Sequence, residues 1–267
     1  MSDSAASTSL ATPTLECLRW SEDGPVGRIT LARPEKLNAL SARLLGELIE
    51  LCGWLHRRAD IRVVVVAGEG RAFSAGFDLG DFSAPASGDP RDGADLGRLA
   101  TNALTDVPQL TIAAVHGRCI GGGAVLVAAC DLRVASEDAL FSIPEVDLGI
   151  PLAWGGIPRL VRELGPAITK ELVLTCRPFT ADEARSLRWI NTVVTRDELE
   201  RHVTDLASSL AAKPLYALRT TKAHVNAVSE EMIGTGRSVL DADSLVYAMR
   251  DPESRRASAS YLSARKK

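Results

Sequence analysis

The sequence predicts an α/β fold in which short buried strands and helices alternate, followed by a mostly helical C-terminal third. Residues 61–67 (IRVVVVA) form a β-branched run between Asp60 and Gly68, which is typical of a strand buried on both faces. From Ser41, a suitable N-cap, apolar residues recur at helical spacing through residue 55. The order strand, strand, helix then repeats, which favours an α/β domain over an all-α or all-β one.

The other elements follow in chain order. A strand at 26–31 (VGRITL) ends before Pro34, because a proline restricts the preceding residue to extended geometry. Beyond Trp154 the strand signal nearly vanishes. The segments predicted between these points are a helix at 94–106, a strand at 111–115, an all-apolar buried helix at 124–130, and strands at 131–135 and 139–143. The helices predicted after Trp154 cover 166–175, 180–187, 197–212 and 214–228.

Composition excludes several classes of protein. The chain has 267 residues, 46% of them hydrophobic, which suffices for one domain with or without a subdomain. Its 31 basic and 34 acidic residues leave a charge of -3, so we expect no nucleic-acid partner, RNA included. No apolar run of roughly 18 residues occurs, so we expect no membrane span.

The cysteines and the N-terminus indicate a cytoplasmic protein. Five widely spaced cysteines form no C-x-x-C pair and no zinc-finger pattern, so we expect buried thiols in a reducing compartment and no metal. Residues 1–14 are rich in Ser, Ala and Thr, but they lack the features of a signal or transit peptide. We expect them to form a loose tail.

Two glycine-containing turns could present backbone amides to a ligand. In the first, residues 73–79 (FSAGFDL), Gly76 permits a sharp turn that brings the amide of Phe77 to a surface. In the second, the glycine triplet 121–123, the Gly122 amide and the helix N-terminus favour negative charge. Each has a plainer interpretation: an ordinary strand-to-loop turn for the first, and close packing of helix on sheet for the second.

Glu145 is the candidate for proton transfer. It lies within 141–149 (FSIPEVDLG), among apolar residues and directly after a proline. Desolvation there would raise the pKa of its carboxyl group and suit it to acid and base catalysis. The plainer interpretation is an exposed loop glutamate.

In their amino-acid sequences and their order along the chain, these segments resemble the crotonase, or enoyl-CoA hydratase/isomerase, superfamily. Further matching phrases are residues 33–40 (RPEKLNAL), 130–133 (CDLR), and Thr221-Lys222 with Val225-Asn226. The resemblance extends from about Leu15 to the C-terminus, and it is specific for the fold and for acyl-CoA binding.

The resemblance implies a crotonase-like spiral of repeated ββα units at 15–205, after the tail at 1–14. It also implies a helical region at 206–267 that helps to form a homotrimer or a dimer of trimers. The ligand would be an acyl-CoA thioester, with coenzyme A as part of the substrate and no separate cofactor. Many relatives carry a basic residue soon after the Asp78-Leu79 pair, whereas Gly80-Asp81 follow here, so the contacts to the phosphates stay open.

The same resemblance assigns roles to individual residues. The amides of Phe77 and Gly122 would form an oxyanion hole for the thioester carbonyl, and Glu145 would be the acid/base. Phe77 and Trp154 would shape the acyl pocket. The residues implied to bind substrate are Lys36, Ala39, Ala75, Gly76, Phe77, Asp78, Leu79, Gly121, Gly122, Val125 and Trp154.

The chain departs from the hydratases at one position. Hydratases of this superfamily place two glutamates around a water molecule, and the first of them would fall at Val125. Since residues three apart share a helix face, Val125 should project beside Gly122 towards the thioester, yet it cannot transfer protons. Ala153 stands where some isomerases of the superfamily carry an aspartate.

A single carboxylate favours double-bond isomerisation. Glu145 alone could remove a proton from one carbon of an allylic system and return it to another, provided that the intermediate enolate is stabilised. Asp147 and His116 could substitute for a missing acid, although each is more simply structural. Two alternatives remain: a true hydratase with a substitute acid or a reoriented water, and a non-catalytic acyl-CoA binding protein. The acyl group itself would depend on loops such as 83–93.

Overall fold

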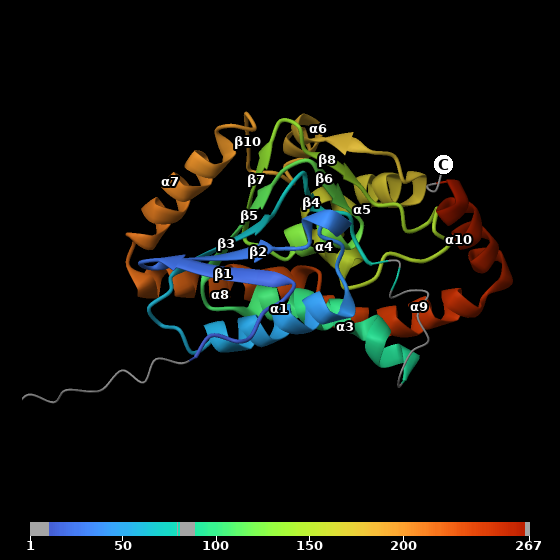
Figure 1. The fold of residues 1–267 in the computed structure, drawn as a ribbon, viewed down its shortest axis with the longest axis horizontal. Coiled ribbons are helices and arrows are strands. Elements are labelled where there is room, and N and C mark those ends of the chain that lie inside the picture. Colours follow the sequence, from blue (N-terminus) through green and yellow to red (C-terminus); the bar gives the residue numbers. More distant parts are fainter. Residues whose placement is uncertain (1–10, 79, 81–88, 265–267) are drawn as a thin grey trace, which may run out of the picture.

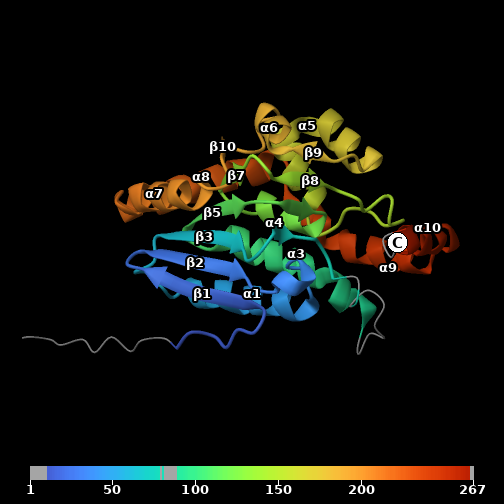
Figure 2. The ribbon, with the colours of Figure 1, turned by 45° about the horizontal axis from the view of Figure 1, so that its top comes forward.

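Two β-sheets form the centre of the computed structural model, which describes residues 11–78, 80 and 89–264. The larger sheet has the strand order β1-β2-β3-β5-β7-β10, with β1 antiparallel to β2 and every other neighbouring pair parallel. Figure 2 shows β1, β2, β3 and β5 in this order across the sheet. Its strands are β1 (Leu18–Asp23), β2 (Val26–Leu31), β3 (Val63–Gly68), β5 (Leu110–Val115), β7 (Leu132–Ser136) and β10 (Thr192–Val194).

The smaller sheet has the order β4-β6-β8-β9, with β4, β6 and β8 mutually parallel. Its strands are β4 (Ala72–Ser74), β6 (Arg118–Ile120), β8 (Leu140–Ser142) and β9 (Phe179–Thr180). Each passage of the chain adds one strand to the larger sheet and the next strand to the smaller one: β3 then β4, β5 then β6, β7 then β8. This is the predicted spiral of ββα units, and the structure confirms it.

Helices cover both faces of the larger sheet, so β3 is buried on both sides as predicted. Val64 and Val66 of β3 belong to the main apolar core, which also contains buried residues of α1 (Ala42–Leu55) and α3 (Pro90–Asp106). Val63 and Val65 face the opposite way, into a second cluster with α7 (Leu199–Ala211). Since successive side chains of a strand point to opposite faces, one valine run supplies both cores. In Figure 1, α1 and α3 lie beneath the sheets and α7 flanks one end.

The structure corrects several sequence-based boundaries. The helix predicted to begin at 94 begins at Pro90, and the buried helix expected at 124–130 is α4 (Gly122–Ala128). The helix expected at 166–175 is the second part of α5 (Gly156–Thr175), which is kinked at Gly165, where φ is 75°. Strands β9 and β10 lie in the region read as helical; they have two and three residues, too short for a periodic pattern.

The C-terminal third is helical, as predicted. It contains α6 (Ala181–Ser186), α7, α8 (Leu215–Met232), the 3-10 turn Thr235–Leu240, α9 (Asp241–Arg250) and α10 (Pro252–Ala264). Figure 1 shows α9 and α10 at the end of the molecule opposite to α7. None of the helices in the described part of the chain is long and apolar enough to cross a membrane. The division at residue 205 remains a prediction.

An ion pair fastens α8 to the larger sheet. Nζ of Lys222 lies 2.9 Å from Oδ2 of Asp131 and donates to the carbonyl oxygen of Gln109 at 2.8 Å. The same Oδ2 accepts hydrogen bonds from the amide and the hydroxyl of Thr111. Asp131 and Lys222 belong to two of the segments that resemble the superfamily, 130–133 and Thr221-Lys222. Because both side chains are largely shielded from solvent, removing either residue would leave the charge of the other without its partner.

Candidate active site

Three loops leave the smaller sheet at one edge, and together they form the candidate site. Strands β4, β6 and β8 are adjacent and parallel, so their carboxyl ends lie side by side. The loops that follow are 75–78, 121–122 and 143–145. The three predicted motifs are therefore neighbours in space, although they are spread over some seventy residues of the sequence.

The first turn is held by backbone contacts that require glycine at position 76. Gly76 has φ of 86°, its amide donates to Oγ of Ser74, and its carbonyl accepts from the amide of Leu40. A Cβ atom here would lie 2.7 Å from the carbonyl oxygen of Ile120 and 3.6 Å from the amide nitrogen of Gly122. The two glycine turns thus pack directly against each other.

The motif at 33–40 supports this first turn. Asn38 is fully buried with φ of 54°, and its side-chain amide donates to the carbonyls of Glu69 and Ala72. Arg33 donates to the carbonyl of Ala39 at 2.6 Å and pairs with Asp78 at 2.8 Å. A loop near residue 36 is thereby tied to the strip at 75–78.

The remaining residues implied for the coenzyme differ in their exposure. Lys36 is exposed, Ala39 is buried, and Asp78 is engaged by the guanidinium of Arg33. Leu79 and most of the loop 83–93 lie outside the described residues. Lys36 is consequently the exposed cation on the loop beside the first turn.

The second turn brings backbone and carboxylate together. Gly121 has φ of 52°, and its amide donates to the carbonyl of Ser142 at 2.8 Å. Gly122 is the first residue of α4, where an amide has no acceptor within its own helix. A Cβ atom at Gly121 would overlap Oε1 of Glu145, so the carboxyl group lies directly over this glycine.

Glu145 is buried, not an exposed loop residue. The residue is 9% exposed, and Oε2 has no hydrogen-bond partner among the described residues. Burial raises the pKa of the carboxyl group to about 7, although a backbone hydrogen bond lowers this pKa and so offsets part of the rise. A carboxyl group with this pKa can accept and return a proton near neutral pH.

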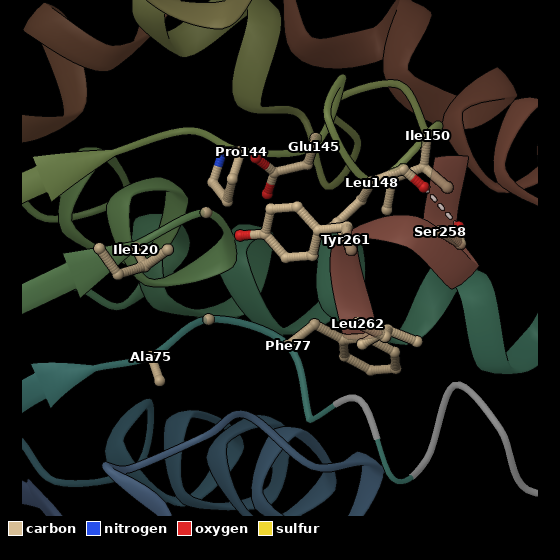
Figure 3. A pocket seen from close by; sticks show the side chains of 12 residues that line it. Ala75, Phe77, Ile120, Pro144, Glu145, Leu148, Ile150, Ser258, Tyr261 and Leu262 are labelled. Atoms are coloured by element: carbon tan, nitrogen blue, oxygen red, sulfur yellow. Dashed lines mark hydrogen bonds between the residues drawn. The ribbon is translucent and has the colours of Figure 1, made fainter. Parts of the chain in front are cut away.

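A cavity of about 50 Å³ lies beneath Glu145 (Figure 3). Its walls are apolar apart from a few groups, and both glycine turns contribute to it. The described residues that line it are Ala75, Gly76, Phe77, Ile120, Gly121, Pro144, Glu145, Leu148, Ile150, Ser258, Tyr261 and Leu262. The site therefore combines two backbone turns, one carboxyl group and a small apolar chamber.

Trp154 lies beside this chamber, outside its lining. Its indole meets the ring of Phe77 edge-on at 5.8 Å, and a Cβ atom at Gly122 would overlap it. The residue has φ of 61°, which is unusual for a tryptophan. Its carbonyl accepts from the hydroxyl of Thr101, and the amide of the next residue donates to Asp241, so the strained backbone is held from α3 and α9.

Val125 and the two substitute acids lie outside the cavity lining. Val125 is buried in the core, and its Cγ2 would lie 2.9 Å from a Cβ atom at Gly156. Nε2 of His116 lies 3.0 Å from the carbonyl oxygen of Gly70, and burial lowers the pKa of its ring. Asp147 is exposed. His116 therefore fits the structural role that the sequence suggested for it.

Sequence reasoning missed the wall formed by α10. Ser258, Tyr261 and Leu262 line the cavity, although we expected the C-terminal helices to serve assembly. Helix α10 (PESRRASASYLSA) has few apolar residues and no fully buried one, so its sequence gives no sign of a docked face. The five cysteines are buried free thiols, as predicted.

The spiral of ββα units with C-terminal helices is the crotonase fold, which is the fold of a class of acyl-CoA enzymes. The family model described as "Enoyl-CoA hydratase/isomerase" matches residues 21–267. The chain belongs to this family.

Relatives with different reactions are similar to the chain. It is 38% identical over 224 residues to the peroxisomal Delta(3,5)-Delta(2,4)-dienoyl-CoA isomerase of Arabidopsis thaliana, covering 79% of this chain and 80% of the relative. It is 32% identical to the short-chain-enoyl-CoA hydratase of Clostridium acetobutylicum, covering 77% and 79%. The crystal structure of a probable enoyl-CoA hydratase from Mycobacterium smegmatis has a TM-score of 0.76 and 33% identity, covering 88% of this chain and 95% of that one.

Proposed function

We propose that the protein moves a carbon–carbon double bond in an acyl-CoA thioester, as a Δ3,Δ2-enoyl-CoA isomerase does, with Glu145 as its proton carrier. The observation that carries the proposal is the buried Glu145 carboxyl group, whose pKa is about 7, above a cavity bounded by both glycine turns. The chemistry needs one base, an anion-stabilising site and exclusion of water. All three have a candidate among the residues just described.

The reaction balances with one proton. Ionised Glu145 removes a proton from C2 of a 3-enoyl thioester, and the electrons of that C–H bond delocalise through the carbonyl and the C3–C4 double bond as a dienolate. The amides of Phe77 and Gly122 would donate hydrogen bonds to the negative thioester oxygen. Protonated Glu145 then returns the proton to C4, which leaves a C2–C3 double bond and restores the carboxylate.

The lack of a carboxylate at positions 125 and 153 supports isomerisation over hydration. Water addition needs one group to activate water and a proton source for the α-carbon, and neither Val125 nor Ala153 can supply one. Double-bond migration needs only a group that reaches both carbons. The Arabidopsis relative is likewise named for moving double bonds.

Hydration is the second candidate, because the Clostridium relative is named a short-chain-enoyl-CoA hydratase. A hydratase lacking a carboxylate at Val125 would have to orient its water with Glu145 and backbone groups alone. A non-catalytic acyl-CoA binder remains the third reading, since loss of a catalytic acid leaves a pocket intact.

We also propose that coenzyme A lies along the strip at 75–78, with Lys36 near its phosphates, and that the chain forms a homotrimer or a dimer of trimers. Lys36 is exposed beside the first turn, which suits a flexible contact to phosphate. Helix α8 exposes an apolar row made of Val225, Val228 and Met232, which suits burial against another copy. Sedimentation of the purified protein would test the assembly.

One experiment separates the three readings. Wild type and Glu145→Gln are given a 2-enoyl-CoA and a 3-enoyl-CoA in heavy water, and the product masses are followed. Migration of the double bond without added water, lost in the variant, is the expected result. Addition of water to the 2-enoyl thioester would overturn isomerisation in favour of hydration, and tight binding of both thioesters without turnover would favour the binder.

A further inference from the structure

We infer that Tyr261 of α10 contacts the bound acyl thioester and donates a third hydrogen bond to the enolate formed beside Glu145. The inference rests on the proposed function, because it takes the acyl group to occupy the cavity beneath Glu145. It assigns a chemical contact to the C-terminal helix of the same chain.

Helix α10 is docked on the Glu145 loop by specific contacts. Gly149 has φ of 71°, and a Cβ atom there would lie 2.5 Å from the carbonyl oxygen of Ser254, so only glycine allows α10 to approach this closely. One turn further along, the hydroxyl of Ser258 donates to the carbonyl oxygen of Leu148. These two contacts place Tyr261 opposite the loop that carries Glu145.

The phenol of Tyr261 extends from α10 into the cavity (Figure 3). Its hydroxyl lies between the side chains of Glu145 and Ile120, and the hydroxyl oxygen is buried. Polar side chains in the described lining belong to Glu145, Ser258 and Tyr261. Tyr261 thus brings a hydrogen-bond donor to the chamber in which the proton is to be moved.

A neutral phenol is well suited to stabilise an enolate without exchanging protons. Tyrosine has an ordinary pKa of about 10, so its hydroxyl remains a donor across neutral pH. Hydrogen bonds to an anion are shorter and stronger than those to a neutral carbonyl. The bond therefore strengthens as the thioester becomes an enolate, which lowers the barrier more than it tightens substrate binding.

The structure also offers matched variants. Tyr261→Phe removes the hydroxyl and keeps the ring that fills the wall. Tyr247→Phe makes the same chemical change on α9, where that residue is 74% exposed and away from the cavity lining. Ser258→Ala removes a docking contact of α10 but keeps the phenol, so it reports what loosening the helix does.

The test measures enolate stability directly, with acetoacetyl-CoA as the probe. Its enolate absorbs in the near ultraviolet, so a pH titration of the bound probe gives the apparent pKa of the ligand. The titration uses Glu145→Gln as the background, because the glutamate then contributes no titration of its own. Glu145 and Tyr261 are the titratable side chains in the described lining.

Adding Tyr261→Phe should raise the apparent pKa of bound acetoacetyl-CoA by about one unit or more, and Tyr247→Phe should leave it unchanged. Tyr261→Met, which also lacks the hydroxyl, should show the same shift and guards against a folding defect of one variant. Ser258→Ala, which loosens α10 but keeps the hydroxyl of Tyr261, should shift this pKa by less than either Tyr261 variant. An unchanged pKa in both Tyr261 variants would overturn the inference.

Turnover distinguishes this inference from the proposed function. With a 3-enoyl-CoA, Tyr261→Phe should lower kcat about tenfold to a hundredfold, with KM changed less than threefold. A wild-type protein without isomerase activity, whose bound probe still depends on the Tyr261 hydroxyl, would refute isomerisation and uphold the contact. Full kcat in Tyr261→Phe, beside inactive Glu145→Gln, would refute the contact and uphold isomerisation.

Discussion

Replacing Glu145 by glutamine should stabilise the fold at alkaline pH and not at acidic pH. The carboxyl group has a pKa of about 7 in the folded protein, against 4.5 as its ordinary value, because it is buried. Below about pH 4.5 it is protonated in both states and costs nothing. Between pH 4.5 and 7 the unfolded chain ionises first, so stability falls as pH rises, and above pH 7 the full cost is present.

The size of this effect follows from the shift in pKa. At about 1.4 kcal/mol per unit, a rise from 4.5 to about 7 corresponds to roughly 3.5 kcal/mol of lost stability above pH 7. Most of that loss, about 2.5 kcal/mol, builds up between pH 5 and pH 8. Glutamine has nearly the same shape and no charge, so Glu145→Gln should gain about this much relative to wild type over that pH range.

Urea unfolding at pH 5 and pH 8, followed by circular dichroism, measures the difference. Glu50→Gln on the exposed face of α1 is the matched control, because it removes the same charge from a solvated position. Glu145→Gln should be more stable than wild type at pH 8 by a margin that shrinks towards pH 5. A margin that is absent at pH 8, or equal at both values, would refute the claim that burial raises this pKa.

Four further outcomes are expected. The isomerase kcat/KM should rise with pH through about 7 and then level off, since Glu145 must be ionised to accept the first proton; a rate independent of pH from 6 to 8 would contradict this. Gly76→Ala should destabilise the fold by about 1–3 kcal/mol in thermal unfolding, because φ is positive and a backbone oxygen lies 2.7 Å from the added methyl group. Lys222→Met should cost up to about 3–5 kcal/mol by leaving the partly buried Asp131 without its cation, and Lys222→Met with Asp131→Asn should recover part of the loss. Trp154→Ala should shift kcat/KM towards longer or branched acyl groups, measured on a series of 3-enoyl thioesters, by emptying space beside the cavity.

The sequence predicted the individual turns and Glu145 better than it predicted that they lie together in space. Gly76, the triplet at 121–123 and Pro144-Glu145 stand out locally, because glycine and proline mark turns whatever surrounds them. Their convergence depends on β4, β6 and β8, which have three residues each and show no period that could be recognised. From the sequence, only the resemblance to a family indicated that the two glycine turns and Glu145 form one site.

Other features depend on tertiary contacts that local pattern does not encode. Spacing of three residues places Val125 on the face of Gly122, yet it cannot say which neighbour that face meets, and in the structure Val125 packs near Gly156 of α5. Tyr261 gave no signal at all, because α10 is weakly amphipathic and its docking depends on Gly149 and Ser254. A cavity wall formed by a segment distant in the sequence, such as α10, cannot be predicted from local sequence patterns.

The wall supplied by α10 also has a consequence for how the protein is made. Ser258 is hydrogen-bonded to Leu148, 110 residues earlier in the chain, and both residues line the cavity. During synthesis the strands that carry both turns and Glu145 emerge long before this helix does. A nascent or prematurely terminated chain that lacks α10 therefore has no wall of Ser258, Tyr261 and Leu262, and its cavity beside Glu145 is open to water; the cavity is closed only after α10 has left the ribosome and docked.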